Sequence, residues 1–320
     1  MEKDVASLKE RNRNIKVLFS YGGGAHINSL LKRLRTEKDQ EKMINTIDSL
    51  VKPKKFDGVN LHLEGPGPSI CNREHFDRIL TFIKKFRFKI MHVDDLLTIQ
   101  LPACRPKCDA VLKTKLARYV DYIFLMTFDY KLDDTKKTKL TSGLNLCEGG
   151  QYSNVGTMPC LKHWVDAGVP RYKLVAGIAT YSRTFTLGDP SSNNVGAALQ
   201  PDQPLGDPGN FTKTVGYMNY VEACRRLKYT NEWTRRWVHS AGMAYLYKGD
   251  QWISYEDEKS ADAKARWFRS QGMGGVFVWS LDTDDYSGDC MGDLFPLVTS
   301  VHHALVGYRP VMDNLHVRAE

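Results

Sequence analysis

The feature that most constrains the fold is a repeated alternation of strand-like and helix-like segments along the chain. Short, β-rich apolar runs precede longer stretches with helical periodicity, an order typical of parallel strands joined by crossover helices. The predicted strands cover residues 15–21, 56–63, 95–101, 122–128, 174–181 and 275–281, and the predicted helices cover 27–51, 72–86, 109–118, 161–167 and 297–305. Six strands suit an open sheet, whereas a closed barrel of this kind needs about eight, so the strand count leaves both architectures open.

One segment interrupts this alternation before the last strand. From residue 182 to about 257, Gly and Pro turns are followed by Tyr- and Trp-rich alternating stretches such as Ala244–Tyr247 and Gln251–Tyr255. Alternation of this type favours antiparallel strands. The sequence therefore predicts a small α+β insertion between two units of the main fold.

The charge of the chain argues against two classes of partner. The formal net charge is +8, from 45 basic and 37 acidic residues, but the basic residues are scattered in short clusters such as 52–55 and 136–139. Such clusters are typical of solvated loops, so we expect no nucleic-acid partner. No run of 18 apolar residues is present, and we expect no membrane span.

The cysteines and the N-terminal residues indicate different cellular compartments. Seven cysteines favour disulfides and an oxidising compartment, and Cys104 and Cys108, spaced C-x3-C without a second pair, are a weak metal signal. We therefore expect no metal site and no cofactor. A glycosylation sequon at Asn210–Thr212 fits the same compartment, yet residues 1–14 lack the apolar core of a signal peptide. Either the protein is cytosolic or the chain starts inside a longer one.

The stretch from Phe56 to Glu64 carries the strongest chemical signal. Because side chains alternate along a strand, Asn60, His62 and Glu64 share one face, and apolar residues occupy the other. Glu64 comes last, at the carboxyl end, where barrel enzymes place their chemistry. The alternative is an exposed edge strand with a polar face. Asp129 and Trp279 also follow apolar strands, which favours one shared pocket.

Several motifs in this order resemble glycoside hydrolase family 18, the chitinases and chitinase-like lectins. The family strand D-G-x-D-x-D-x-E matches residues 57–64, except that Asn60 and His62 stand at the two middle acids. The remaining matches are S-x-G-G at Ser20–Gly23, M-x-Y-D at Met126–Asp129 with Phe128 in place of Tyr, T-Y-G-R at Thr180–Arg183 with Ser182 in place of Gly, and two stretches at 247–252 and 274–285.

The resemblance implies a fold and a domain organisation. It implies a (β/α)8 TIM-type barrel that lacks its first two strands, with a small α+β insertion before the last barrel strand. The expected parts are residues 1–181 (barrel strands three to seven), 182–257 (insertion), 258–308 (last barrel unit and terminal helix) and 309–320 (tail). The chain then corresponds to the C-terminal part of a secreted, extracellular protein or to a truncated gene product.

The resemblance also implies a substrate-assisted mechanism, in which the sugar acetamide oxygen attacks the anomeric carbon. Glu64 is the expected proton donor. His62 stands where an Asp accepts the acetamide N–H, Asn60 removes the neighbouring carboxylate, and Phe128 lacks the hydroxyl that holds the acetamide oxygen. Each loss is expected to cost about 10²- to 10⁴-fold in rate.

Binding residues are better retained than catalytic ones. By resemblance, substrate contacts are expected at Asp129, Tyr181, Arg183 and Trp279, although Gly24 and Gly65 replace two aromatic residues of the family pattern. The leading interpretation is a chitinase-like protein that binds chitin or N-acetylglucosamine oligomers with little or no hydrolysis. The alternatives are a residual chitinase that uses Glu64 and a degenerate fragment with a growth-factor-like or scaffold role.

The resemblance further implies a disulfide between Cys224 and Cys290. Pairs between Cys147 and Cys160 and between Cys104 and Cys108 are also expected. Cys71 then remains unpaired, or its partner precedes residue 1.

Overall fold

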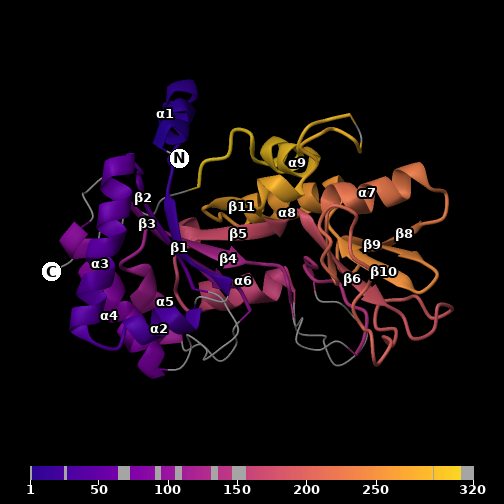
Figure 1. Cartoon of the computed structure of the whole chain (residues 1–320), viewed down its shortest axis with the longest axis horizontal. Helices are drawn as coiled ribbons and strands as arrows, with labels where there is room; N and C mark the ends of the chain where they lie inside the picture. The colour runs from indigo at the N-terminus through magenta and orange to yellow at the C-terminus, as the bar shows by residue number, and fades with distance from the viewer. Residues whose placement is uncertain are drawn as a thin grey trace. The chain divides into compact units, whose positions relative to one another are not determined.

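The computed structural model describes residues 2–24, 27–63, 73–90, 95–104, 110–130, 136–145, 156–290 and 292–310. It forms two compact units, the first made of Met1–Leu125 with His163–Leu174 and the second of Met126–Lys162 with Val175–Glu320. Figure 1 colours the chain from indigo at its N-terminus to yellow at its C-terminus.

The first unit contains parallel strands flanked by helices. Its strands β1 (Phe19–Gly22), β2 (Gly58–His62), β3 (Leu96–Pro102) and β4 (Tyr122–Met126) are ordered β1-β2-β3-β4. The helices are α1 (Glu2–Arg11), α2 (Ile27–Arg33), α3 (Glu37–Val51), α4 (Arg73–Ile90), α5 (Ala110–Ala117) and α6 (Thr157–Asp166), of which α6 begins in the second unit. Helices α3 and α4 lie side by side (Figure 1).

Strand β2 is an interior strand, so the alternative of an exposed edge strand is wrong. It pairs in parallel with β1 on one side and with β3 on the other, and all five of its residues are buried. Gly58 permits this close approach: its φ is 151°, and a Cβ there would lie 1.9 Å from the Leu96 carbonyl oxygen. Asp57 fixes the start of the strand because its Oδ2 accepts a 2.7 Å hydrogen bond from the Val17 amide.

The single helix predicted over residues 27–51 is two helices, α2 and α3. The break falls at Thr36, whose side chain accepts a hydrogen bond from the Asp39 amide and caps the start of α3. Met43, Ile44 and Ile47 then form the buried face of α3. A cap of this kind outweighs apolar periodicity that continues on both sides of it.

The second unit combines two parallel strands with an antiparallel sheet. Strands β5 (Leu174–Ala179) and β11 (Gly275–Trp279) pair in parallel. The antiparallel sheet, drawn in red to orange in Figure 1, has the order β7-β6-β10-β9-β8. Its strands are β6 (Tyr181–Thr186), β7 (Tyr217–Asn219), β8 (Thr234–Val238), β9 (Met243–Lys248) and β10 (Gln251–Tyr255).

Three helices complete the second unit: α7 (Tyr220–Tyr229), α8 (Glu258–Ser270) and α9 (Pro296–Leu305). The sequence did not predict α1, α7 or α8, although capping boxes begin both α7, at Asn219 with Glu222, and α8, at Asp257 with Ser260. Parallel strands alternating with helices, together with an antiparallel insertion, confirm the predicted α/β class.

The predicted disulfide between Cys224 and Cys290 is present. It closes a loop of 66 residues, which in the chain-entropy model contributes on the order of 4 kcal/mol. Cys104 takes part in a disulfide as well, and so does Cys160. Cys71, Cys108 and Cys147 lie outside the described residues, so the other predicted pairings remain predictions.

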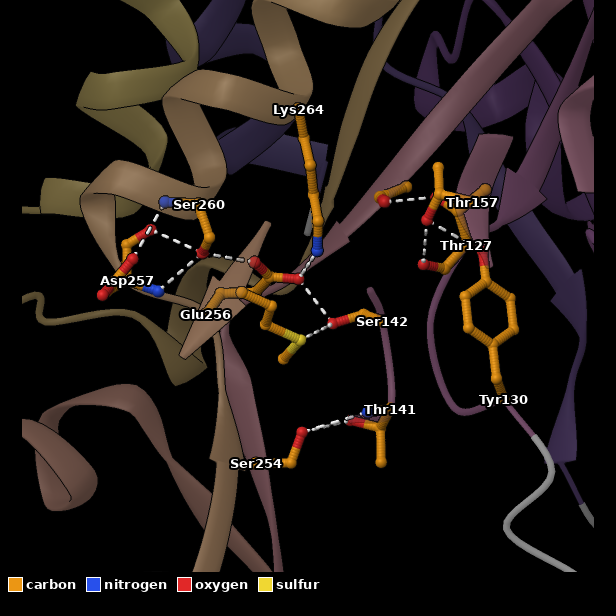
Figure 2. Close-up of polar contacts among 12 residues, drawn as sticks. Thr127, Tyr130, Thr141, Ser142, Thr157, Ser254, Glu256, Asp257, Ser260 and Lys264 are labelled. Carbon is orange, nitrogen blue, oxygen red and sulfur yellow. Dashed lines mark hydrogen bonds and ion pairs between the residues drawn. The ribbon is translucent and has the colours of Figure 1, made fainter. Parts of the chain in front are cut away.

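A buried ion pair joins the end of β10 to helix α8 (Figure 2). The side chains of Glu256 and Lys264 are each only 1% exposed. Ser142 and Ser260 donate hydrogen bonds to the two oxygens of the Glu256 carboxylate, the second at 2.6 Å. The carboxylate is therefore fully engaged, and it connects a loop, a strand and a helix.

Removing one member of this pair should be costly. We expect Glu256→Gln to lower the free energy of unfolding by about 3–5 kcal/mol, because it removes the carboxylate that balances the buried Lys264 charge. The double variant Glu256→Gln with Lys264→Met should be more stable than Glu256→Gln alone. Urea unfolding followed by circular dichroism measures both values, and additive losses would contradict the expectation.

A second buried cation, Lys113 on α5, has no hydrogen-bond partner for its Nζ atom. The ammonium group lies 5.0 Å from the centre of the Trp164 ring. Burial lowers the pKa of Lys113 from 10.5 to about 8, since desolvation disfavours the charged form.

This lowered pKa gives stability a definite pH dependence. Below pH 8, Lys113 is protonated in both states and its desolvation cost is fully present. Between pH 8 and 10.5, the unfolded chain holds a proton that the folded chain has lost, so stability rises with pH. Lys113→Met should remove this rise and raise the free energy of unfolding at pH 7 by up to about 3 kcal/mol.

The control for this prediction is Lys115→Met, at an exposed position of the same helix. Chemical unfolding at several pH values between 7 and 10.5 compares the three proteins. If wild type and Lys113→Met share the same slope against pH, Lys113 does not titrate in this range.

Candidate functional site

In the first unit, polar side chains lie in layers across β1, β2 and β3. Ser20, Asn60 and Thr98 are partners in the strand register and form one layer. Asn60 donates to Ser20 Oγ at 2.9 Å, and Thr98 donates to Asn60 Oδ1 at 2.9 Å. These contacts hold Asn60 in place as a neutral amide where the family motif has an acid.

The next layer, nearer the carboxyl ends of the strands, contains Gly22, His62 and Gln100. His62 is buried, and the glycines of β1 make room for it: a Cβ on Gly23 would lie 2.7 Å from His62 Nδ1. The Gly23 amide donates a 2.8 Å hydrogen bond to the His62 carbonyl oxygen. The S-x-G-G motif therefore serves to pack β1 closely against the imidazole. Glu64, the predicted proton donor, lies outside the described residues.

In the second unit, three of the four predicted binding residues form one cluster. The Asp129 carboxylate accepts a hydrogen bond from the Tyr181 hydroxyl at 2.8 Å and another from Arg183 Nε at 2.9 Å. A further bond from Arg183 Nη2 makes the Arg183–Asp129 pair bidentate. Asp129 comes directly after Phe128, and Tyr181 and Arg183 both lie on β6. A carboxylate and a guanidinium held in this way form a rigid polar surface.

The neighbours of Arg183 and Tyr181 favour the charged form of the first and the neutral form of the second. The Arg183 guanidinium lies over the Tyr181 ring at 5.0 Å and over the Tyr217 ring at 5.2 Å. Burial opposes the charge of Arg183, but the hydrogen bonds and proximity of Asp129 raise the pKa of Arg183 overall. Burial, followed by the nearby Asp129 charge, raises the pKa of Tyr181. Tyr181 therefore remains a neutral donor and Arg183 a cation at any physiological pH.

Phe128 is part of the apolar support beneath this cluster. It is buried, with its ring 6.0 Å from those of Tyr181 and Phe277, in edge-on contact with both. Gly177 permits this packing, because a Cβ there would lie 2.7 Å from both Phe128 and Phe277. The motif position thus contributes hydrophobic contact and no hydroxyl.

Trp279 is the fourth predicted binding residue. It lies at the end of β11 and is 40% exposed. The alternative interpretation, a core tryptophan at a strand end, does not fit this exposure. An indole ring that is partly open to solvent offers an apolar face for packing against a sugar ring.

Two residues that contact or pair with predicted site residues, one in each unit, were missed in the sequence analysis. Tyr217 stacks on Tyr181 with ring centres 5.0 Å apart and an angle of 29°, and it lies opposite Arg183 in the register of β6 and β7. Gln100 is the register partner of His62. Both positions depend on strand pairing, and no motif in the sequence marks them.

A separate surface pocket of about 620 Å³ lies among α7, α8 and α9. Its polar walls are bonded to one another: the Tyr220 hydroxyl donates to Glu258 at 2.8 Å, and Arg235 pairs with Asp257. Cys224 of the predicted disulfide lines this pocket, and none of the predicted catalytic and substrate-binding residues that the structure describes does so.

Two kinds of site are lacking in the described part of the chain. Among its residues, no group of three or more His, Cys, Asp or Glu side chains is arranged to hold a metal ion. None of its helices is long and apolar enough to cross a membrane.

Comparison with known proteins places this geometry in a family. The model of the family described as "Glycosyl hydrolases family 18" matches residues 2–284. Chitotriosidase-1 of Mus musculus is 30% identical over 316 residues, which are 95% of this chain and 66% of the relative. The oviduct-specific glycoprotein of Ovis aries is 31% identical over 312 residues, 93% of this chain and 56% of the relative. The chain thus spans less than two thirds of the length of either.

Solved structures give the same result. The Group IV chitinase of Ostrinia furnacalis, solved with allosamidin, matches with a TM-score of 0.87 and 28% identity, over 95% of this chain and 83% of that one. Human YKL-39, described as a pseudo-chitinase with retained chitooligosaccharide binding properties, matches with a TM-score of 0.84 and 26% identity, over 95% and 84% of the two chains. These neighbours confirm the predicted TIM-barrel class of fold. The chain therefore belongs to glycosyl hydrolase family 18.

Proposed function

We propose that this protein binds chitin or N-acetylglucosamine oligomers and hydrolyses them slowly or not at all. The observation that carries the proposal is the pair Asn60 and His62, which are buried on an interior strand where the family motif has two acids. Asn60 is a neutral amide that is hydrogen-bonded to both of its neighbours in the layer, so this position offers a ligand no carboxylate.

The expected loss of catalysis follows from charge. In the family mechanism, a carboxylate accepts the acetamide N–H and offsets the positive charge that develops on the sugar. A neutral imidazole at His62 accepts one hydrogen bond in only one tautomer, and a protonated one adds charge of the wrong sign. Each change weakens transition-state stabilisation while leaving ground-state contacts available.

The expected binding is supported by the second unit. Asp129, Tyr181 and Arg183 are fixed by mutual hydrogen bonds, and Trp279 presents a partly exposed ring. Binding without hydrolysis has a precedent in the family, since human YKL-39 is described as a pseudo-chitinase that retains chitooligosaccharide binding. Residual hydrolysis through Glu64 remains the second candidate, because active chitinases are also among the relatives.

We also propose an extracellular location and a three-part organisation. Disulfides support an oxidising compartment. Residues 182–257 are proposed as the insertion, flanked by barrel parts at 1–181 and 258–308, because most of the antiparallel sheet lies within that segment. Residues 309–320 are proposed as a tail.

A binding measurement tests the function directly. We expect the chain to bind tetra-N-acetylchitotetraose in isothermal titration calorimetry and to release little or no product from a fluorogenic chitobioside. Trp279→Ala should weaken binding at least several-fold because it removes the apolar sugar platform. The matched control is Trp237→Ala, a partly buried tryptophan of β8 outside the proposed site.

Three results would count against this proposal. Absence of binding by wild type would favour a role unrelated to carbohydrate. Turnover that Glu64→Gln abolishes would favour the residual chitinase. Equal loss of affinity in both tryptophan variants would remove Trp279 from the site.

Restoring the missing carboxylates tests the catalytic half of the proposal. We expect His62→Asp combined with Asn60→Asp to gain chitobioside turnover by about 10²-fold or more over wild type. His62→Asp alone should supply most of the gain, since the acetamide contacts that position in the family mechanism. Asn60→Asp alone should do little, because its neighbour would remain an imidazole.

Two further variants complete the turnover assay. Adding Glu64→Gln to the double variant should abolish the gain, because an amide cannot donate the required proton. Adding Phe128→Tyr should increase it further. If the double variant folds, as judged by circular dichroism, and gains no turnover, the missing acids are not what limits hydrolysis.

A further inference from the structure

Gln100 holds the one buried side-chain amide nitrogen among the described residues that has no hydrogen-bond partner. The residue lies on β3 and is only 3% exposed. Its Oε1 faces Asn60 Nδ2 at 3.5 Å, so the amide nitrogen is turned to the other side. A buried donor left unsatisfied costs about 1–3 kcal/mol, and native proteins seldom retain one without a use for it.

The register of the strands shows which surface this donor belongs to. Gln100 pairs with His62, and His62 pairs with Gly22, so the three residues form one layer, which lies at the carboxyl ends of β1 and β2 and two residues before the end of β3. The layer below it, Ser20, Asn60 and Thr98, is closed by its own hydrogen bonds. The unused donor therefore lies toward the carboxyl ends of the strands, where barrel proteins bind their ligands.

The chemistry of these two layers selects the type of ligand atom. Their side chains are hydroxyl, amide and imidazole groups with no carboxylate, and β1 contributes only glycine to the upper layer. An N–H donor in such surroundings is best satisfied by a strong, uncharged acceptor. An amide carbonyl oxygen is a strong acceptor of this kind.

We propose that Gln100 is a ligand-contacting residue whose Nε2 donates a hydrogen bond to the carbonyl oxygen of an N-acetyl group on a bound sugar. This inference rests on the proposed glycan binding and names a residue that selects acetylated sugars. Phe128 has no hydroxyl to offer that oxygen, so under this proposal Gln100 supplies the donor that Phe128 lacks.

A specificity ratio tests the proposal. Calorimetry measures the affinity of wild type and of Gln100→Met for the tetramer of N-acetylglucosamine and for the tetramer of glucosamine. The ratio of the two affinities should fall about 3- to 10-fold in the variant, the value of one neutral hydrogen bond. Affinity for the glucosamine tetramer should not change, because that ligand has no carbonyl oxygen.

Thermal unfolding separates this role from a structural one. Gln100→Met keeps the side-chain volume and removes an unsatisfied donor, so its melting temperature should equal or exceed that of wild type. The matched control is Gln40→Met on α3, another buried glutamine, whose Nε2 donates to the Leu34 carbonyl oxygen at 2.9 Å. It should lower the melting temperature and leave the specificity ratio unchanged.

A second variant, Gln100→Glu, keeps the shape and replaces the donor with an acceptor. It should lose at least as much affinity for the acetylated tetramer as Gln100→Met does. If wild type prefers the acetylated tetramer and both Gln100 variants keep that preference, the inference is wrong while the proposed function stands. If wild type binds neither tetramer, both are wrong.

Discussion

The close pairing of β2 between β1 and β3 is the constraint on which the rest of the first unit depends. It requires glycine at position 58, where any Cβ would overlap the Leu96 carbonyl group, and it buries every residue of the strand. Polar side chains on such a strand must then find partners within the sheet or in a ligand. The identities of Asn60, His62 and Gln100 are consequences of this requirement as much as of any chemistry.

Neutral residues at the two acid positions of the family motif avoid the electrostatic cost of burying two carboxylates. Two neighbouring buried carboxylates cannot both ionise cheaply, and one must hold a proton or a strong donor. Asn60 avoids this cost because its amide both donates and accepts within one layer. The same sheet leaves a different donor, Gln100 Nε2, without a hydrogen-bond partner.

The sequence predicted what local chemistry determines and missed what strand pairing determines. Alternation of apolar residues located the strands, and family motifs located Asp129, Tyr181 and Arg183, which the structure brings together. The predicted helix continued past Thr36 because apolar periodicity carries no information about a capping hydrogen bond. Tyr217 and Gln100 were missed because each is defined by a partner far away in the sequence.

The replaced motif positions and the predicted binding residues depend on different interactions in this chain, so a change in one set does not require a change in the other. The replaced acids all lie on β2 in the first unit, whereas Asp129, Tyr181 and Arg183 are held by bonds made wholly within the second. The Arg183–Asp129 pair is bidentate, and Arg183 lies over two tyrosine rings, so the geometry of the pair is fixed without a ligand. A preorganised polar surface retains affinity because little ordering entropy is lost on binding. The neutral residues at the two motif positions of the first unit therefore leave the hydrogen bonds of Asp129, Tyr181 and Arg183 unchanged.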